Sequence, residues 1–278
     1  MLLNLITNLL RSAAVLLVTT FAAFAMMFGN ATGIASSVLG IGATEESVQA
    51  KVVELGLDRP LMVQYWDWLT SAVTGDLGRS YYSGQSVSDA LSQRVPVTLS
   101  VIVPALILTA VLSVLLGVWA AVKGGAIDRF VQFLSIGGTA IPNFIVAIAL
   151  VFTLAIHWRV FPATGYTTFG DDPAMWLASI TLPMLALLVG AVAGGAQQFR
   201  TAMLDTLGND YVRTLRARGM KERPIIFQHA LRNAAAPGLT VVSLTTLSLL
   251  GGAVFIEQVF ALPGMGRLAT DAAKISDV

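Results

Sequence analysis

The sequence contains no cysteine and only two histidines, His157 and His229. The lack of thiols excludes a disulfide framework and a metal site built from thiolates. The sequence also lacks a Gly-x-x-x-x-Gly-Lys-[Ser/Thr] segment, so this chain cannot hold ATP phosphates in a loop of that kind. We therefore predict that the chain is not an enzyme and binds no metal or cofactor of its own.

Charged residues are scarce as well. They make up 12% of the 278 residues, whereas 55% of the residues are hydrophobic and the mean hydropathy is +0.75. A soluble domain of average composition has about 25% charged residues. This composition predicts a membrane protein, and the net charge of +1 says little until it is divided between the two sides of the membrane.

Five charge-free apolar runs are long enough to cross a bilayer, which takes about 17–25 residues in a helix. They lie at residues 12–28, 95–122, 130–156, 173–199 and 234–256. We predict an all-α membrane protein with these runs as spans, kinked where Pro104, Pro142 and Pro183 interrupt the helical hydrogen bonds. Because no span contains an Asp, Glu, Lys or Arg residue, a proton-driven carrier built on an intramembrane carboxylate is disfavoured.

The first run has a second interpretation. Residues 31–35 resemble the small-residue cleavage region of a signal peptide, which would remove the preceding helix. We favour a retained first membrane helix over residues 1–29.

Residues 30–94 have the composition of a soluble segment and are predicted to lie outside the cell. We expect short helices over residues 46–55 and 61–73, separated by Gly56-Leu57-Asp58-Arg59-Pro60. Tyr65, Trp66 and Trp68 in the second helix are predicted to lie at the membrane interface.

The distribution of charge predicts the orientation. If the N-terminus is cytoplasmic, the inner side holds ten positive and four negative residues, and the outer side seven and twelve. The resulting charges of +6 inside and −5 outside agree with the positive-inside rule, and His157 and His229 then lie on opposite faces. Residues 200–233 thus form a cytoplasmic loop, and residues 257–278 an external C-terminal stretch.

The cytoplasmic loop contains seven of the 17 Lys and Arg residues. Asn209 or Asp210 can cap a helix that runs to Arg218, and Gly219 can end it in a left-handed conformation. Pro224 can lie in the first turn of a second helix. Two short amphipathic helices with a sharp turn between them would form a docking device, although many basic loops on this side of a membrane bind nothing specific.

Three motifs in this loop resemble a known signature. They are Asp210-Tyr211-Val212-Arg213-Thr214, Arg216-Ala217-Arg218-Gly219 and His229-Ala230-Leu231-Arg232-Asn233, followed by Pro237. They resemble the coupling loop, or EAA loop, of ABC importer permeases in the variant found in oligopeptide, dipeptide and nickel importers. Leu215 and Arg218 depart from the usual Ala and Lys. The resemblance extends from Arg11 to Asp277, although the usual Pro-Gly-Asp-Pro after the first helix is missing.

The resemblance implies a type I ABC importer permease in the bacterial plasma (inner) membrane, with residues 95–278 as the permease core and a sixth helix expected beyond residue 278. It also implies four kinds of partner: a homologous second permease subunit, two cytoplasmic ATPase subunits that bind ATP and Mg, an extracytoplasmic substrate-binding protein and the lipid bilayer. Nucleic acid is not an expected partner. The residues implied to contact the ATPases are Asp210, Tyr211, Arg213, Thr214, Arg216, Ala217, Arg218, Gly219, Phe227, His229, Arg232 and Asn233.

Uncharged polar residues within the spans are candidates for lining a path for a polar solute. They are Thr139, Asn143, Thr240, Ser243 and Thr246. The alternative is that the hydroxyl groups bond carbonyls of their own helix or of adjacent helices.

Three functions remain open at this point. The first is a permease subunit for di- or oligopeptides, which couples ATPase motion to alternating access. The second keeps this machinery but imports nickel chelate, glutathione or another small solute. The third is a stand-alone secondary carrier or channel. The sequence does not identify the substrate.

Overall fold

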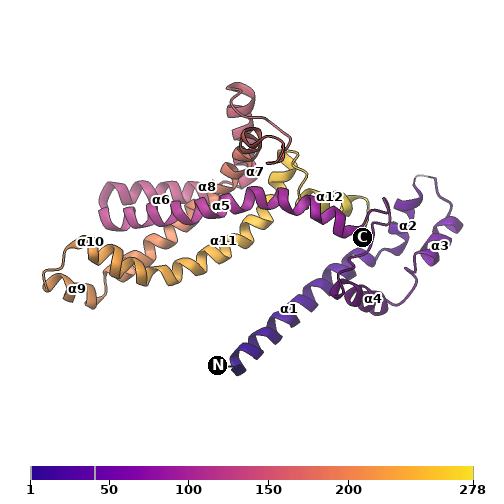
Figure 1. Ribbon diagram of the computed structural model, residues 1–278, viewed down its shortest axis with the longest axis horizontal. Helices are drawn as coiled ribbons and strands as arrows, with labels where there is room; N and C mark the ends of the chain where they lie inside the picture. Colours follow the sequence, from indigo (N-terminus) through magenta and orange to yellow (C-terminus); the bar gives the residue numbers. More distant parts are fainter. Residues whose placement is uncertain (1, 41, 278) are drawn as a thin grey trace. The chain divides into compact units, whose positions relative to one another are not determined.

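The computed structural model describes residues 2–40 and 42–277, and the described part of the chain contains helices and no named strand (Figure 1). The chain forms two compact units. The first comprises the residues up to Arg94 together with those from Leu268 onward, and the second comprises Val95–Arg267. Two helices, α5 (Val87–Lys123) and α12 (Met265–Lys274), begin in one unit and continue into the other.

The first unit contains α1 (Leu2–Phe28), α2 (Ala31–Leu39), α3 (Glu45–Glu54) and α4 (Leu61–Val73). The residues of α1 from Ile6 to Phe28 form a helix long and apolar enough to cross a membrane. The sequence predicted α3 and α4 but not α2. The side chain of Asn30 accepts a hydrogen bond from the Gly33 N–H at 3.0 Å, so it caps α2 at the place where a cleavage region was considered.

Helix α4 packs on α1 through Tyr65, which is only 4% exposed. The Tyr65 ring meets Phe21 and Phe24 edge-on, and its hydroxyl lies 2.9 Å from Oγ1 of Thr20. Tyr65 is therefore a core residue of this unit, and its place at the membrane interface stays a prediction. Trp66, the next residue, is exposed.

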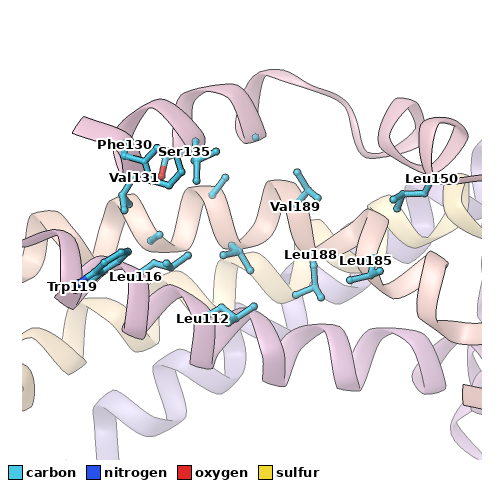
Figure 2. A pocket seen from close by; sticks show the side chains of 15 residues that line it. Leu112, Leu116, Trp119, Phe130, Val131, Ser135, Leu150, Leu185, Leu188 and Val189 are labelled. Carbon is cyan, nitrogen blue, oxygen red and sulfur yellow. The ribbon is translucent and has the colours of Figure 1, made fainter. Parts of the chain in front are cut away.

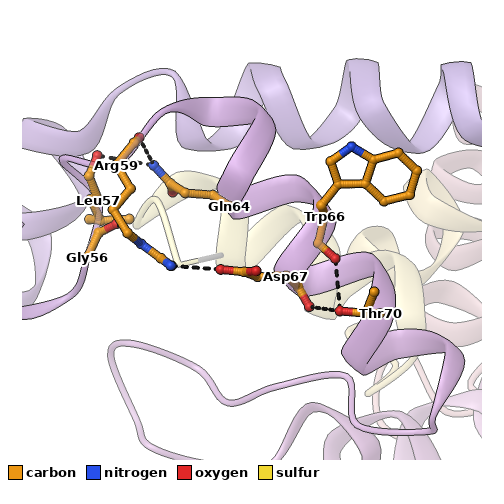
Figure 3. Close-up of polar contacts among 7 residues, drawn as sticks. All are labelled: Gly56, Leu57, Arg59, Gln64, Trp66, Asp67 and Thr70. Atoms are coloured by element: carbon orange, nitrogen blue, oxygen red, sulfur yellow. Dashed lines mark hydrogen bonds and ion pairs between the residues drawn. The ribbon is translucent and has the colours of Figure 1, made fainter.

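The turn between α3 and α4 is held by the side chain of Gln64 (Figure 3). This buried amide donates hydrogen bonds to the carbonyls of Leu57 and Arg59, at 3.3 and 2.6 Å. Arg59 in turn forms an ion pair with Asp67 at 2.7 Å. Because a buried amide without partners is costly, these bonds fix the segment Gly56–Pro60 in one conformation.

The second unit is built around α8 (Pro173–Leu207), against which α6 (Gly125–Ala140), α7 (Asn143–Leu150) and α11 (Leu231–Val259) pack. Helix α8 begins at Asp172, whose carboxylate accepts hydrogen bonds from two backbone N–H groups of the first turn. Both α5 and α8 continue through their internal prolines without a break. Figure 1 shows short helices α9 and α10 at one end of this unit and α7 at the other.

Small residues bring these helices close together. A Cβ atom on Gly117 would overlap backbone atoms of α8, and one on Gly195 would overlap the Ser113 side chain of α5. A Cβ on Gly138 would likewise overlap Ala193. These positions explain why the apolar runs contain so many glycines, since close approach gives helices in a membrane most of their packing energy.

The third predicted span, residues 130–156, is not one straight helix. Helix α6 ends at Ala140, and α7 begins at Asn143 and continues as the π-helical segment η1 (Val151–His157), with a bend of 96° between the two arms. Ile141 is extended (φ −93°, ψ 119°) because the ring of the following Pro142 disfavours a helical conformation there. In the described residues, four helices are long and apolar enough to span a membrane, or five if this bent pair counts as one.

Candidate functional site

The cytoplasmic loop predicted over residues 200–233 is mostly helical. We call residues 210–230 the elbow, which contains α9 (Asp210–Ala217), a turn, α10 (Glu222–Pro224) and the π-helical segment η2 (Ile225–Ala230). Asn209 occupies the N-cap position of α9, as one of the two predicted caps, but its side chain makes no capping hydrogen bond. The negative charge of Asp210 in the first turn is favourable to the helix dipole.

The turn after α9 is fixed by two backbone hydrogen bonds. Gly219 has a φ of 77°, which confirms the predicted left-handed residue. Its N–H donates to the Arg216 carbonyl at 2.9 Å, and the Met220 N–H donates to the Leu215 carbonyl at 3.2 Å. This pair of bonds is the Schellman motif, which ends a helix by satisfying carbonyls that the helix itself leaves free.

The second half of the elbow differs from the prediction. Pro224 lies in the first helical turn as expected, but no separate short helix follows it. Instead α10, η2 and α11 form one helical run, Glu222–Val259, of 38 residues. In η2 the Leu231 N–H donates to the Ile226 carbonyl, five residues back. The elbow therefore consists of one short helix and the beginning of the last long helix.

The elbow is folded against the ends of the membrane helices. Val212 and Ile225 are fully buried, and Ile226 and Ala230 pack with Met203 of α8 in a small apolar core. The buried face fixes which side chains point outward.

Two polar contacts tie α9 to the long helix. The Asn233 side-chain amide donates to the Tyr211 hydroxyl at 2.8 Å. The Arg216 guanidinium donates to both carboxylate oxygens of Glu222, at 2.7 and 3.2 Å. This hydrogen bond lowers the pKa of Glu222, although the exposure of both side chains limits what the pair adds to stability. Glu222 was not among the predicted site residues, because a separation of six residues matches no helical contact.

The solvent-exposed face of the elbow is basic but also includes apolar side chains. Phe227 is 61% exposed although it follows two buried isoleucines. Arg218 is exposed and forms no ion pair with any residue that the structure describes. The other predicted docking residues on the outside are Asp210, Arg213, Thr214, Ala217, Gly219, Arg232 and Asn233, whereas Tyr211 and His229 are half-buried. Met220 is also exposed and was not predicted.

A polar cavity of about 440 Å³ lies at the break between α6 and α7. Thr139 and Asn143 line it, together with Gln198, Thr245 and Ser248. The remaining candidates for lining a path, Thr240, Ser243 and Thr246, do not. Thr240 and Thr246 donate instead to carbonyls of their own helix, at 3.3 and 3.0 Å. A transport path through this cavity stays a prediction.

At the opposite end of the long helix, Glu257 is only 2% exposed. Its carboxylate accepts hydrogen bonds from Oγ1 of Thr98 at 2.5 Å and from the Arg267 N–H at 2.9 Å. The Met265 N–H donates to the same threonine oxygen at 2.9 Å. The sequence placed Glu257 at the start of the external C-terminal stretch and did not predict its burial, whereas α11 extends to Val259 and the carboxylate is buried. Glu257 thus joins α5, α11 and the first turn of α12.

The described residues contain no group of three acidic or histidine side chains that could hold a metal ion. The notable features of the described residues are instead a folded elbow at one end of a continuous helix and the buried carboxylate of Glu257 at the other end.

Comparisons with known proteins identify the family. Residues 113–278 match the binding-protein-dependent transport system inner membrane component, and residues 1–102 match the N-terminal membrane component of such systems. A Brucella abortus (strain 2308) protein named as a candidate peptide transport system permease is 39% identical over 242 residues, 87% of this chain and 77% of the relative. The oligopeptide transport system permease protein AppB of Bacillus subtilis (strain 168) is 33% identical over 273 residues, 97% of this chain and 86% of the relative. The corresponding OppB protein of Mycobacterium bovis is 36% identical over 232 residues, 79% of this chain and 71% of the relative.

The members of this family work with ATPase and substrate-binding partners. Such partners account for a folded, solvent-exposed elbow on a multi-pass membrane chain that lacks a phosphate-binding loop of its own. The chain belongs to the binding-protein-dependent transport system inner membrane components, the permease subunits of ABC importers.

Proposed function

We propose that this chain is the permease subunit of an importer for di- or oligopeptides and that its elbow is the docking site for a cytoplasmic ATPase subunit. Phe227, which is exposed directly after two buried isoleucines, carries this proposal together with Arg218, which is unpaired within the described residues and lies in the turn of the same elbow. An apolar side chain that a fold leaves in water, with uncompensated positive charge around it, suits a partner with an apolar pocket and an acidic rim.

In this mechanism the ATPase subunits bind ATP and Mg and perform the hydrolysis, and the chain itself has no catalytic site. Closure of the ATPases on ATP moves the two elbows of the paired permease subunits together. Because Glu222–Val259 is one helical run, the movement reaches Glu257 without an intervening loop. The N-terminus lies in the cytoplasm, and the far end of the run faces the substrate-binding protein outside.

Peptides are the substrate that the relatives' names and the polar cavity support together. The cavity is lined by amides and hydroxyls, including Asn143, Gln198 and Ser248, and by no charged side chain. Such groups can bond the amides of a peptide backbone whatever its side chains, which a broad-specificity path requires.

The docking proposal can be tested with neighbouring substitutions. Phe227→Ser removes the exposed ring, and Gln228→Ser changes an adjacent exposed residue as the control. With the complete transporter in proteoliposomes, Phe227→Ser should reduce ATP-dependent peptide uptake and the amount of ATPase subunit that co-purifies, and the control should change neither. Wild-type uptake and co-purification for Phe227→Ser would contradict docking at this face.

A further inference from the structure

An apolar groove runs along the second unit between α5, α6 and α8 (Figure 2). Its volume is about 440 Å³, and its walls include Leu112, Leu116, Phe130, Leu188 and Val189. Ser135 and the indole N–H of Trp119 are the only polar side-chain groups among the lining residues. A groove of this composition cannot serve a polar substrate, so it is separate from the polar cavity at the helix break.

The length of the groove matches one leaflet of a bilayer. The α8 residues that line it extend from Leu185 to Ala196, which is about 16 Å along the helix axis. Half of the hydrocarbon core is about 15 Å. A transmembrane helix of a partner subunit would lie along the full thickness of the core, whereas a single acyl chain would occupy this length.

One end of the groove carries uncompensated positive charge. Trp119 and Phe130 lie at this end (Figure 2), and Lys123 follows Trp119 by one helical turn in α5. Arg129 directly precedes Phe130. Both cations are exposed, and neither forms an ion pair with any residue from 2–40 or 42–277.

The third cation in this region is already neutralised. Arg200 of α8 forms a two-pronged ion pair with Asp128, and the bond between NH2 and Oδ2 measures 2.7 Å. Asp128 is therefore not available to balance Lys123 or Arg129. The two free charges lie where the polar headgroup of a lipid would be if its chain filled the groove.

We propose that this groove binds an anionic phospholipid, with one acyl chain against α5, α6 and α8 and the phosphate beside Lys123 and Arg129. The negative surface potential of a cytoplasmic leaflet attracts basic residues at this depth, and basic pockets between membrane helices bind anionic headgroups. The lipid would fill the space between these three helices. This lipid site is independent of the proposed function, because it involves neither the transported substrate nor the ATPase that docks on the elbow.

The test uses the complete transporter in bacterial membranes. A photoreactive benzoylphenylalanine replaces Leu134, which lines the groove and is 49% exposed, or Leu115, which is 60% exposed on α5 outside it. After illumination, mass spectrometry of this chain identifies the molecule attached at each position. We expect phospholipid adducts at both positions, with the ratio of phosphatidylglycerol and cardiolipin to phosphatidylethanolamine several-fold higher at Leu134.

The charge requirement is tested in the same experiment. The double variant Lys123→Gln, Arg129→Gln should lower the anionic ratio at Leu134 to that at Leu115. Two outcomes would overturn the proposal. One is an adduct at Leu134 with another polypeptide, which would show that protein covers the groove, and the other is an equal lipid ratio at the two positions. Because the readout is an adduct and not transport, either result leaves the proposed function untouched.

Discussion

Replacement of Gly219 is the sharpest test of the elbow. A side chain at a φ of 77° costs about 1–2 kcal/mol in the left-handed region. A Cβ atom added at this glycine would meet nothing within 4 Å, so the cost comes from the backbone and not from a clash. Since 1.4 kcal/mol corresponds to a factor of about ten in an equilibrium, Gly219→Ala should increase the opened fraction of the turn roughly tenfold.

The side-chain series follows from the same cause. Gly219→Val should open the turn further than Gly219→Ala, because a β-branched residue tolerates this region least, and Gly219→Asn should open it less. Trypsin cleavage after Arg218 and Lys221 reports the opened fraction, provided that closing is fast relative to cleavage.

The functional assay is peptide uptake by the complete transporter in proteoliposomes, measured beside ATP hydrolysis. We expect uptake per ATP to fall in the order Asn, Ala, Val, with the amount of membrane-inserted protein unchanged. If trypsin cleavage, peptide uptake and ATP hydrolysis of the Gly219→Val variant all proceed at the wild-type rates, the conformation of this turn is not required and the elbow is not the coupling element.

Three further predictions concern other parts of the chain. Thr98→Val removes a hydrogen bond to the buried carboxylate of Glu257 and should destabilise the purified complex by about 1.5–3 kcal/mol, measured by chemical unfolding, and an unchanged midpoint would mean that the bond is absent. The hydrogen bond from its arginine partner lowers the pKa of Asp128 below 3.8, so the stability that this pair contributes is present above that pH and is lost as the pH falls through the lowered value. Asp128→Asn should flatten this acid dependence in thermal unfolding, and an identical acid profile would contradict the assignment. A reporter fused after Asp76 should lie outside the cell and one near Asn209 inside, and both on one side would contradict the charge distribution.

The sequence predicted most of the membrane helices because a bilayer imposes length and apolarity on them, and both are properties of composition. It also predicted the turn at Gly219, because few residues other than glycine tolerate that conformation. Both predictions depend on local chemistry. They needed no knowledge of which helix packs against which.

The features that were missed depend on contacts distant in the sequence. The burial of Glu257 was not predicted, because it depends on the hydrogen bonds that Thr98 of α5 and the Arg267 N–H donate to its carboxylate. The burial of Tyr65 was missed because no local pattern shows that Phe21 and Phe24 of α1 pack against its ring. Pro142 predicted a kink, but the size of the bend depends on how both arms pack.

The long helices also determine how far the elbow stands from the membrane. Helix α8 continues seven residues beyond Arg200, to Leu207, which adds about 10 Å along its axis after the charge-free run that ends at residue 199. The final helical run begins at Glu222, twelve residues before the apolar run that starts at residue 234, or about 18 Å. The headgroup layer on one side of a bilayer is only about 5–8 Å thick. With the helix axes close to the membrane normal, we therefore expect the elbow to extend past the lipid headgroups into water, where a folded protein could approach Phe227 and Arg218 without displacing lipid.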